Sequence, residues 1–584
     1  MRILSFGVNN FRGISGGIQN NRIIFDDSNT IFIFGQNNVG KSTFLKAYEF
    51  FYKSKDPTEE DIFRKRGDES IEFEMELSLD ENDFLKIQSV APNKIDNLKK
   101  YLKDGFLLKI RREFGRKQEK EKTTFLKVKN VTWNWNDGIW EDTCYGGIGL
   151  DTVFQSCLPT PIFIQAMPSE IEVENIINTI LSDKAERSLK STELKELKTA
   201  QDKLKELQDK MYNPQAVENY KREVNSHFSK LFPDTEIHFS DKDNMAWTPA
   251  KLGKKFEIHF QKKDADGEID GAIPNSYKQI GHGAIRSAIF SLLLMRDIAD
   301  EFERKQNRKD YLVLFEEPEL FLHPKLMREL RTLIYAVSED DYPYQVLCAS
   351  HSPQMIDISK TKSSLIRMIR DNDGTKIFQI DDEYLKDAKN IKTKEELKSE
   401  MYEVLRFNPF ICESFYSDEV ILIEGPTEEI ILRGYLGEKG SRKDIFIVNC
   451  GTVNNIPFYQ KIFSKFSIKY NIICDTDNAS FDGVDENGVK KFTSGIQKTI
   501  YDQYRIDKDL GIALKFFYHE DTFEPAHNTE VIPEELRLKP EEYIVSNGKP
   551  YNANLYWKNI LSKNLNNPDI QKVPIISFAK SILS

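Results

Sequence analysis

The sequence predicts an α/β protein in which two different phosphate- and metal-handling modules follow one another along one chain. Three patterns indicate this. A short apolar strand leads into a glycine-rich loop and a helix near the N-terminus, a later apolar strand ends in two glutamates, and apolar strands in the last third of the chain end in carboxylates. Strands that alternate with helices in this way are typical of α/β domains, whose ligand sites lie at the carboxyl ends of the strands.

Size and composition limit the class of protein. The 584 residues are enough for two or three domains, and 39% hydrophobic with 30% charged residues is typical of a soluble protein with a charge-rich surface. No apolar run is long enough to cross a bilayer and the N-terminus does not resemble an export signal, so we expect no membrane association and a cytoplasmic location. The 6 cysteines are scattered without a C-x-x-C pair, which makes a disulfide scaffold or a zinc site unexpected.

The charge balance bears on nucleic-acid binding. A net charge of −11 argues against a uniformly basic DNA-coating protein, but it does not exclude a nuclease, because metal-binding carboxylates add negative charge. The densest basic segment is 109–122. Glutamates interrupt it, so a solvated hairpin of mixed charge is favoured over a DNA contact.

The glycine-rich loop at 35–42 has the complete G-x-x-x-x-G-K-S pattern. A strand is expected before it at 30–34 and a helix after it at 42–51, which is the context that the motif requires. The glycines let backbone N–H groups point at phosphates, the lysine reaches the β- and γ-phosphates, and the serine hydroxyl faces Mg²⁺. The loop residues expected to bind ATP are Gly35, Asn38, Gly40, Lys41, Ser42 and Thr43, with Ser42 also a metal ligand.

The rest of the chain divides into segments by pattern. Further strands are expected at 71–79, 106–114 and 125–135. A charged helical stretch then carries apolar residues at intervals of three and four, and Pro214 is expected to end it. These apolar residues are Leu194, Leu197, Ala200, Leu204, Leu207 and Met211. They form either a dimer contact or the packing between two helices of one hairpin. The expected segments are an N-terminal ATPase half at 1–167, a helical insertion at 168–231, a C-terminal ATPase half at 232–404 and an α/β metal domain at 405–584.

The second half of the ATP site is expected after residue 232. An apolar strand at 311–315 ends in Glu316, expected to bind Mg²⁺, and Glu317, expected to polarise the attacking water. Most P-loop proteins have aspartate at the first of these positions. Another strand ends at His351. A glycine-containing turn at 278–287 supplies Gly281, Gly283 and Arg286, and Gln165 is a weaker candidate for a nucleotide contact.

The order of these motifs along the chain resembles that of the ABC-type ATPases of the structural-maintenance and RecF-like branch. The opening segment 10–14 also resembles that branch. The resemblance implies a head-to-head dimer in which ATP bound by Gly40–Ser42 of one subunit is covered by the turn with Gly281, Gly283 and Arg286 of the other. It also implies that His351 senses the γ-phosphate.

Carboxylates follow the strands of the last domain. A strand at 420–423 leads to Glu424, and Glu428 lies one turn into the next helix. After a strand at 445–448, a third strand at 471–474 leads to Asp475 and Asp477, whose side chains are expected to share one face of an extended chain. Carboxylates gathered at neighbouring strand ends repel one another, and Mg²⁺ or Mn²⁺ is their natural neutraliser. Two such ions can activate water for phosphodiester cleavage.

This spacing resembles the Toprim fold, and together with the upstream ATPase the whole chain resembles the OLD (overcoming lysogenization defect) family of ATP-dependent endonucleases. That family includes the nuclease subunit of the Gabija antiphage system and retron-associated effectors. The resemblance is weakest over 52–160 and the last 90 residues. It implies that Glu424, Glu428, Asp475 and Asp477 bind metal. It also implies a further acidic ligand and a catalytic lysine, for which Glu524 and Lys572 are chosen, although both can equally be surface residues.

The function expected from this resemblance is a metal-dependent DNA endonuclease gated by ATP and used in antiphage defence. Its cofactors would be ATP with Mg²⁺ in the ATPase site and two Mg²⁺ or Mn²⁺ ions in the Toprim site. The alternative is a sensor or scaffold whose Toprim module stays inhibited in a complex with a helicase, a reverse transcriptase or nucleic acid. A topoisomerase or primase is not expected, because no domain presenting a nucleophilic tyrosine and no zinc-binding cysteines are evident.

Overall fold

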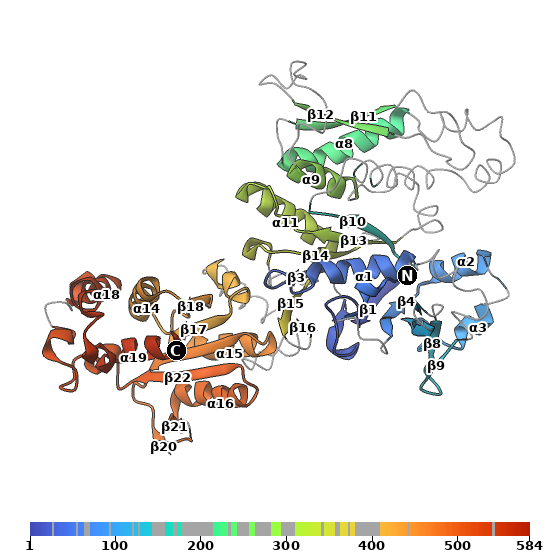
Figure 1. Ribbon diagram of the computed structural model, residues 1–584. Coiled ribbons are helices and arrows are strands. Elements are labelled where there is room, and N and C mark those ends of the chain that lie inside the picture. The colour runs from blue at the N-terminus through green and yellow to red at the C-terminus, as the bar shows by residue number, and fades with distance from the viewer. Residues whose placement is uncertain are drawn as a thin grey trace. The chain divides into compact units, whose positions relative to one another are not determined.

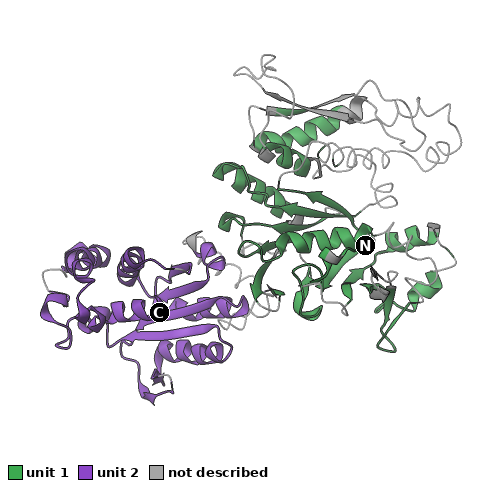
Figure 2. Cartoon of the chain, in the orientation of Figure 1, with its two compact units in different colours: residues 1–377 green, residues 378–584 purple. Residues whose placement is uncertain are grey.

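The structure, a computed structural model, forms two compact units, Met1–Ile377 and Phe378–Ser584 (Figure 2), which we describe separately. It describes the whole chain except the segments 26–28, 54–56, 64–69, 91, 93–94, 120–121, 126–128, 143–157, 167–172, 174–175, 177–213, 232–234, 242–255, 263–281, 294–309, 340–343, 357–362, 372–373, 380–408, 442, 487, 540–543 and 584. The domain boundary expected near residue 405 falls in an undescribed segment and stays a prediction.

The first sheet of unit 1 is antiparallel and has six strands. Their order is β2 (Arg22–Ile24), β1 (Arg2–Asn9), β4 (Ile71–Ser78), β5 (Leu107–Phe114), β8 (Lys129–Asn134) and β9 (Ile139–Glu141). The strands expected at 71–79 and 106–114 are confirmed. The strand expected at 125–135 contains β8 (Lys129–Asn134), whereas Phe125 is the last residue of β7 (Lys122–Phe125), which pairs with β6 (Arg116–Glu119), and 126–128 lie outside the described residues.

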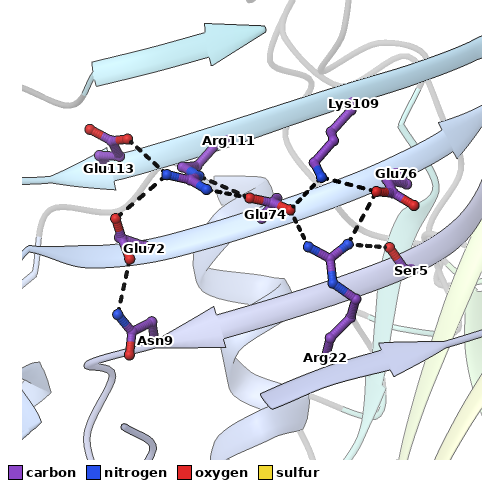
Figure 3. Close-up of polar contacts among 9 residues, drawn as sticks. All are labelled: Ser5, Asn9, Arg22, Glu72, Glu74, Glu76, Lys109, Arg111 and Glu113. Carbon is purple, nitrogen blue, oxygen red and sulfur yellow. Dashed lines mark hydrogen bonds and ion pairs between the residues drawn. The ribbon is translucent and has the colours of Figure 1, made fainter. Parts of the chain in front are cut away.

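One face of this antiparallel sheet carries a network of ion pairs (Figure 3). Glu74, whose side chain is 1% exposed, lies among Arg22, Lys109 and Arg111, with Lys109 Nζ at 3.0 Å and Arg111 at 2.6 Å. The guanidinium of Arg111 also lies 4.3 Å from the centre of the Trp140 ring. The basic segment expected to form a hairpin of mixed charge therefore begins with cations that are already paired within the sheet.

The second sheet of unit 1 also has six strands and holds the strand expected before the glycine loop. From β10 to β15 its neighbouring strands run parallel. The order is β10 (Thr160–Ile164), β13 (Tyr311–Glu316), β14 (Tyr344–Ala349), β3 (Thr30–Phe34), β15 (Ser363–Asp371) and β16 (Gly374–Gln379). Strands β3 and β14 are buried along their whole length, as continuous apolar runs in parallel sheets are.

Helix α1 (Lys41–Lys53) links the two sheets of unit 1. Its Phe44 and Tyr48 contact Phe6 of β1 edge to face, at ring-centre distances of 5.6 and 5.7 Å. The same helix contacts β10, β13 and β14 of the parallel sheet. The aromatic core thus fixes the first turn of α1, where Lys41, Ser42 and Thr43 lie.

Other helices complete unit 1 (Figure 1). Helix α11 packs against β14 and β3 of the parallel sheet. Pro214, expected to end a helix, is the first residue of α8, a position that suits proline because the first N–H of a helix has no partner. The apolar seam at 194–211 lies outside the described residues. The remaining elements are α2 (Glu81–Val90), α3 (Ile95–Lys99), α8 (Pro214–Leu231), α9 (His282–Leu293), α11 (Pro324–Glu339), the paired strands β11 (Thr235–Asp241) and β12 (Phe256–Lys262), and the short 3-10 helices η1 (Gln19–Asn21), η2 (Glu59–Asp61) and η7 (Pro353–Met355).

Unit 2 is built on a parallel sheet of four strands. Their order is β18 (Ile445–Asn449), β17 (Glu419–Ile423), β19 (Lys469–Asp475) and β22 (Ala513–His519). The chain moves from β17 to β18 on one side and then crosses to β19 on the other. The carboxyl ends of β17 and β19 therefore form the point where the strand order reverses, which is where open α/β sheets place ligands.

Helices cover both faces of this sheet (Figure 1). On one face, α14, α18 and α19 share a hydrophobic core with Ile421 and Ile423 of β17. On the other face, α15 and α16 enclose Asp507, which accepts hydrogen bonds from Tyr470 Oη and Ser464 Oγ, each at 2.6 Å. The elements are η8 (Pro409–Phe415), α14 (Pro426–Lys439), η9 (Val453–Asn455), α15 (Ile456–Lys465), the hairpin β20 (Phe481–Val484) and β21 (Lys490–Phe492), α16 (Gly495–Asp509), α17 (Phe523–Ala526), η10 (Glu534–Leu536), η12 (Val545–Asn547), α18 (Lys549–Tyr556), η13 (Trp557–Leu561), η14 (Ser562–Asn564), η15 (Pro568–Lys572) and α19 (Pro574–Leu583).

Among the helices that the structure describes, none combines the length and the apolar character that crossing a membrane requires.

Candidate ATP and metal sites

The glycine loop follows β3 and curls back on itself before α1. Gly35 and Gly40 have φ angles of +140° and +110°. A Cβ atom at Gly35 would lie 2.2 Å from the carbonyl oxygen of Met368, and one at Gly40 would lie 2.8 Å from Thr375 Oγ1. Both the backbone conformation and the close neighbours therefore require glycine at these positions.

The loop lysine lies inside the curl. Lys41 Nζ donates hydrogen bonds to the carbonyl oxygens of Gly35 and Gln36, each at 2.7 Å, and lies 3.4 Å from His351 Nδ1. Burial lowers the pKa of Lys41 to about 8, against the opposing charge of Glu317. The ammonium thus occupies the centre of the loop, where it can meet a phosphate.

The other loop residues expected to bind ATP lie around this centre. Ser42 and Thr43 follow Lys41 in the first turn of α1 and are partly exposed, while Asn38 is exposed with φ +62°. Gln165, the weaker candidate, directly follows β10 of the same sheet.

The two expected glutamates lie at the end of β13, next to the loop. Glu316 is the last residue of β13, and Glu317 turns away from the strand with φ +45°, its N–H donating to the carbonyl oxygen of Ala349. Its carboxylate lies 3.7 Å from Nε2 of His351. Burial first, and then the charge of Lys41, lower the pKa of His351 to about 4, so this ring is neutral near pH 7. The structure brings Lys41, Glu317 and His351 together.

A third glutamate of the same turn, Glu319, was not expected from the sequence. Its Oε1 accepts a hydrogen bond from the backbone N–H of His351 at 2.6 Å, and burial raises the pKa of its carboxyl group. The only sequence signal for Glu319 is its place in the run Glu316-Glu317-Pro318-Glu319, because the periodicity of a strand does not place residues beyond its end.

Arg286, expected to contact ATP across a dimer, is fully buried within its own unit. It lies on α9, and its guanidinium donates to the carbonyl oxygens of Glu317 at 2.6 Å and Leu320 at 2.5 Å, with Glu316 at 3.2 Å. In this structure Arg286 holds the glutamate-bearing turn and does not face the glycine loop. Gly283 lies in α9, and Gly281 lies outside the described residues.

In unit 2, three expected metal ligands meet at the carboxyl edge of the sheet. Glu424 directly follows β17, and Asp475 is the last residue of β19, the parallel neighbour of β17. The backbone N–H of Asp475 lies 3.5 Å from Glu424 Oε2. Glu428 lies in the first turn of α14 and is buried. The expectation that these carboxylates gather at neighbouring strand ends agrees with the structure.

The carboxylates disfavour one another's charge. Burial, and then the charges of Asp475 and Glu424, raise the pKa of Glu428 to about 8. Burial raises the pKa of Asp475 to about 6, with Glu524 adding to the effect. Burial and Asp475 also raise the pKa of Glu424. A group of acids in this state is stabilised by a divalent cation.

Asp477 joins the cluster for a reason other than the one expected. Strand β19 ends at Asp475, so alternation along a strand does not place Asp477. Its φ is +43°, its N–H donates to the carbonyl oxygen of Asp521 at 3.0 Å, and its Oδ2 accepts from Nε2 of Gln497 at 3.3 Å. A turn pinned by the segment after β22 therefore holds this carboxylate, whose pKa is raised by burial and by Asp475.

The segment after β22 supplies two further acids. The charges of two acids both act on Asp475: Glu524, whose expected role as a metal ligand stays a prediction, and Asp521, which sequence reasoning missed. Asp521 is held by its N–H, which donates to Thr476 Oγ1 at 2.8 Å. The only sequence signal for Asp521 was its place in the short acidic run that also contains Glu524.

The structure places Lys572, the expected catalytic lysine, on the short helix η15. Its Nζ pairs with Asp569 at 2.9 Å on η15, and its side chain is 46% exposed. The lysine whose charge acts on the carboxylates is instead Lys549, the exposed first residue of α18. It opposes the raised pKa values of Glu424, Glu428, Asp475 and Asp477. No motif surrounds Lys549, and only the folding of the C-terminal helices onto α14 brings it near.

A histidine lies directly behind Asp475. His519 Nδ1 is 2.9 Å from Asp475 Oδ1, and one potential ligand atom from each of Glu428, Asp475 and His519 lies within 4.8 Å of the others. Burial lowers the pKa of His519 to about 3, so the ring is neutral. Sequence reasoning missed this residue because a single histidine at the end of an aromatic strand is usually a core residue.

The residues at this edge fit a divalent metal ion. Buried carboxylates with raised pKa values are oxygen donors without enough positive charge among the described residues to balance them. Mg²⁺ and Mn²⁺ prefer such oxygen ligands.

Two family models match the chain. A model of the AAA ATPase domain matches residues 168–356, which contain Glu316 and His351 but not the glycine loop. A model of the Toprim domain of proteins like the overcoming lysogenization defect protein matches residues 415–477. That range contains Glu424, Glu428, Asp475 and Asp477.

Several known proteins are similar to the chain. The Old nuclease of Escherichia phage P2 is 24% identical over 466 residues, which cover 76% of this chain and 72% of that protein. The OLD nuclease of Thermus scotoductus is 24% identical over 30% of this chain and 32% of its own length. Endonuclease GajA of Bacillus cereus is 22% identical over 27% of this chain and 25% of its own length.

A solved Smc head domain with an extended coiled coil, from Pyrococcus furiosus, matches 67% of this chain with a TM-score of 0.40 and 13% identity, and all of that chain is covered. A likeness of this degree supports no argument about function. A region that matches the AAA ATPase domain is therefore followed in this chain by a region that matches the Toprim domain of OLD-like proteins, and the chain is similar to nucleases of the OLD family.

Proposed function

We propose that the chain is a divalent-metal-dependent DNA endonuclease whose cutting is gated by ATP. The observation that carries this proposal is the cluster of Glu424, Glu428, Asp475 and Asp477 at the carboxyl edge of the unit 2 sheet, in a chain that also carries a glycine loop. Support also comes from the related proteins, which are named nucleases. A role in antiphage defence is part of the proposal and follows the family resemblance.

In the proposed nuclease site, Glu424, Glu428, Asp475 and Asp477 hold the metal, and Asp521 and Glu524 add negative charge beside it. Bound Mg²⁺ or Mn²⁺ would supply an activated water and stabilise the leaving oxygen. The exposed ammonium of Lys549 is free to meet a phosphate of the DNA while its charge acts on the carboxylates. In this proposal the carboxylates bind the divalent metal ion, and Lys549 binds a phosphate of the DNA.

In the proposed ATP site, the phosphates take over the hydrogen bonds that Lys41 Nζ makes to Gly35 and Gln36. Ser42 and Glu316 would hold the magnesium ion, and Glu317 would accept the proton of the attacking water. The neutral His351 ring lies between Lys41 and Glu317, where it can report on the terminal phosphate. A homodimer that covers the nucleotide with Gly281 and Gly283 of the second subunit is part of the proposal.

The test is cleavage of supercoiled plasmid by the purified chain in Mg²⁺ or Mn²⁺, with and without ATP, beside Asp475→Ala and Lys41→Ala. We expect metal-dependent cutting that Asp475→Ala abolishes. In Lys41→Ala, we expect the rate of cutting to be the same with and without ATP. The sign of the gating is read from the ATP lanes. If every form leaves the plasmid intact while ATP is still hydrolysed, the isolated chain is no nuclease, and a sensor held in a complex with a helicase, a reverse transcriptase or nucleic acid replaces the proposal.

A further inference from the structure

Two buried histidines lie behind the metal cluster, and the proposed reaction uses neither of them. His519 ends β22 and His527 follows α17, and both side chains are fully buried. Their ring centres are 5.1 Å apart with the planes at 68°, and the ring of His527 stacks on Phe523 at 3.9 Å. Together with Phe523 they form a layer between Asp475 and the C-terminal helix.

The hydrogen bonds of His527 fix where its proton lies. Nε2 accepts from the backbone N–H of Ile575, in the first turn of α19, at 3.3 Å. The proton is therefore on Nδ1, which donates to the carbonyl oxygen of Phe523 at 2.8 Å. His527 thus ties the start of α19 to α17, the helix that carries Glu524.

Among the described residues, the ring of His519 forms a hydrogen bond only with Asp475. Nδ1 faces Asp475 Oδ1 at 2.9 Å, and because an ionised carboxylate only accepts, Nδ1 is the donor. Nε2 of His519 has no hydrogen-bond partner among the described residues. The backbone N–H of Phe523 also donates to Asp475. The single hydrogen bond of this buried ring therefore goes to a carboxylate at the metal site.

We propose that His519 is a positioning residue for Asp475. Its Nδ1–H holds Oδ1, so that the carboxylate presents its remaining oxygen to the metal in one orientation, and the stack of His527 on Phe523 fixes the ring of His519 from the C-terminal side. Partners behind metal ligands are known to set ligand orientation and metal affinity. The inference rests on the proposed function, because it takes Asp475 to be a metal ligand.

Through His527, the C-terminal helix α19 also supports the layer behind Asp475. Helix α19 packs on α14, which carries Glu428, and through His527 its first turn reaches the layer behind Asp475. The last residues of the chain thus support the metal site although they supply none of the proposed ligands.

The test measures Mn²⁺ affinity of the full chain without ATP, by the electron paramagnetic resonance signal of free Mn²⁺. Asp475→Ala gives the binding that remains outside the Toprim site. His519→Leu removes the donor, whereas His519→Asn keeps an N–H near the position of Nδ1. We expect His519→Leu to weaken Mn²⁺ binding about 10–100-fold and His519→Asn to stay close to the unchanged chain.

Tyr470→Phe is the matched control for a loss of stability alone. Tyr470 lies on the same strand as Asp475, and its replacement by Phe removes the hydrogen bond to Asp507 of α16 on the other face of the sheet. We expect its melting temperature to fall without a change in Mn²⁺ affinity. His527→Asn, which keeps the donor to Phe523 but loses the acceptor for Ile575, is expected to weaken Mn²⁺ binding less than His519→Leu does.

The outcomes separate the two proposals. If the unchanged chain binds no more Mn²⁺ than Asp475→Ala, the metal-dependent function itself is wrong. If it binds Mn²⁺ but folded His519→Leu binds equally well, the positioning role is wrong. Equal loss in His519→Asn and His519→Leu would instead make the ring a direct ligand and also overturn the inference. Should His519→Leu not fold, unchanged affinity in His527→Asn would contradict the proposed support from α19.

Discussion

At the scale of single residues, the two lysines considered for the nuclease site differ in what surrounds them. Lys572 is held by Asp569 in a local ion pair three residues away, of a kind that exposed helices commonly contain. Lys549 has no motif around it, but its charge acts on four carboxylates from distant parts of the chain. A lysine's position in the fold, and not its neighbours in sequence, decides its chemistry here.

We therefore expect Lys549→Ala to slow plasmid cleavage by about 10²–10³-fold, because a cation that meets developing phosphate charge contributes on that scale. Lys572→Ala is the matched control and should cleave at the rate of the unchanged chain. Cleavage rates at saturating Mn²⁺ test this. A loss in Lys572→Ala with none in Lys549→Ala would reverse the assignment.

In the ATP site, two variants separate hydrolysis from nucleotide binding. Glu317→Gln should lower the rate of ATP hydrolysis by about 10²–10⁴-fold, because it removes the carboxylate proposed to accept the proton of water. Its affinity for a fluorescent ATP analogue should be retained, whereas Lys41→Ala should lose affinity. Equal hydrolysis by Glu317→Gln and the unchanged chain would remove Glu317 from its proposed role.

At the scale of elements, a network of ion pairs joins β4 to β5 in the antiparallel sheet. Glu74 is buried among three cations, so removing its charge leaves Arg22, Lys109 and Arg111 without their shared partner. Breaking a buried ion pair by removing one partner costs about 3–5 kcal/mol. Glu113, 25% exposed and 3.6 Å from Arg111, has far less to lose.

Glu74→Gln should accordingly lower the free energy of unfolding of unit 1 by a few kcal/mol, whereas Glu113→Gln should change it by less than about 1 kcal/mol. Urea unfolding midpoints, followed by tryptophan fluorescence from the neighbouring Trp133 and Trp140, measure both. Equal midpoints for the two variants would show that the network does not stabilise the sheet.

The pH dependence of this network has a definite sign. Burial opposes the charge of Glu74, but hydrogen bonds and charges from Arg111, Arg22 and Lys109 outweigh burial and lower its pKa below the ordinary value of 4.5. The stabilisation is therefore complete above that value and is lost as pH falls through the lower pKa of the folded state. Acid unfolding of unit 1 should start at higher pH in Glu74→Gln, and identical acid transitions would contradict this.

At the scale of the whole molecule, the acidic cluster makes the stability of unit 2 depend on pH. In unit 2 the carboxyl groups of Asp475 and Glu428 have pKa values raised to about 6 and about 8. Because the folded state then holds protons that the unfolded chain has released, unit 2 without metal loses stability as pH rises from about 4 to 8. A bound metal competes with those protons, so its effect grows over the same range.

We expect Mn²⁺ to raise the melting temperature of unit 2 more at pH 8.5 than at pH 5.5, measured by calorimetry without ATP. Asp475→Asn, which cannot ionise at this position, should show a smaller shift at both pH values. A shift independent of pH would mean that metal does not displace protons from this cluster.

How much of this could be predicted from the sequence depends on the distance along the chain between the partners. The glycine loop and the strand ends at Glu316, Glu424 and Asp475 were predictable, because each lies within one strand–loop–helix segment with a fixed pattern. The turn that holds Asp477 was not, since Asp521 and Gln497 reach it from other elements.

The residues that sequence reasoning missed share this property. Glu319, His519, Asp521 and Lys549 contact or act on site residues that lie far away in sequence, and none belongs to a motif of fixed spacing. The contact of Arg286 with ATP across a dimer stays a prediction. Its hydrogen bonds to the backbone of Glu317 and Leu320, which join residues more than thirty positions apart, were not predictable from the sequence.

The ion-paired face of the antiparallel sheet has a consequence for how the proposed DNA binding depends on salt concentration. A protein gains affinity from counterion release only when its unpaired cationic side chains replace the counterions bound along the DNA. Lys109 and Arg111 already face carboxylates, so they displace few counterions. Alanine at these positions should leave the slope of affinity against salt concentration unchanged, and that slope will report on the cations of other surfaces.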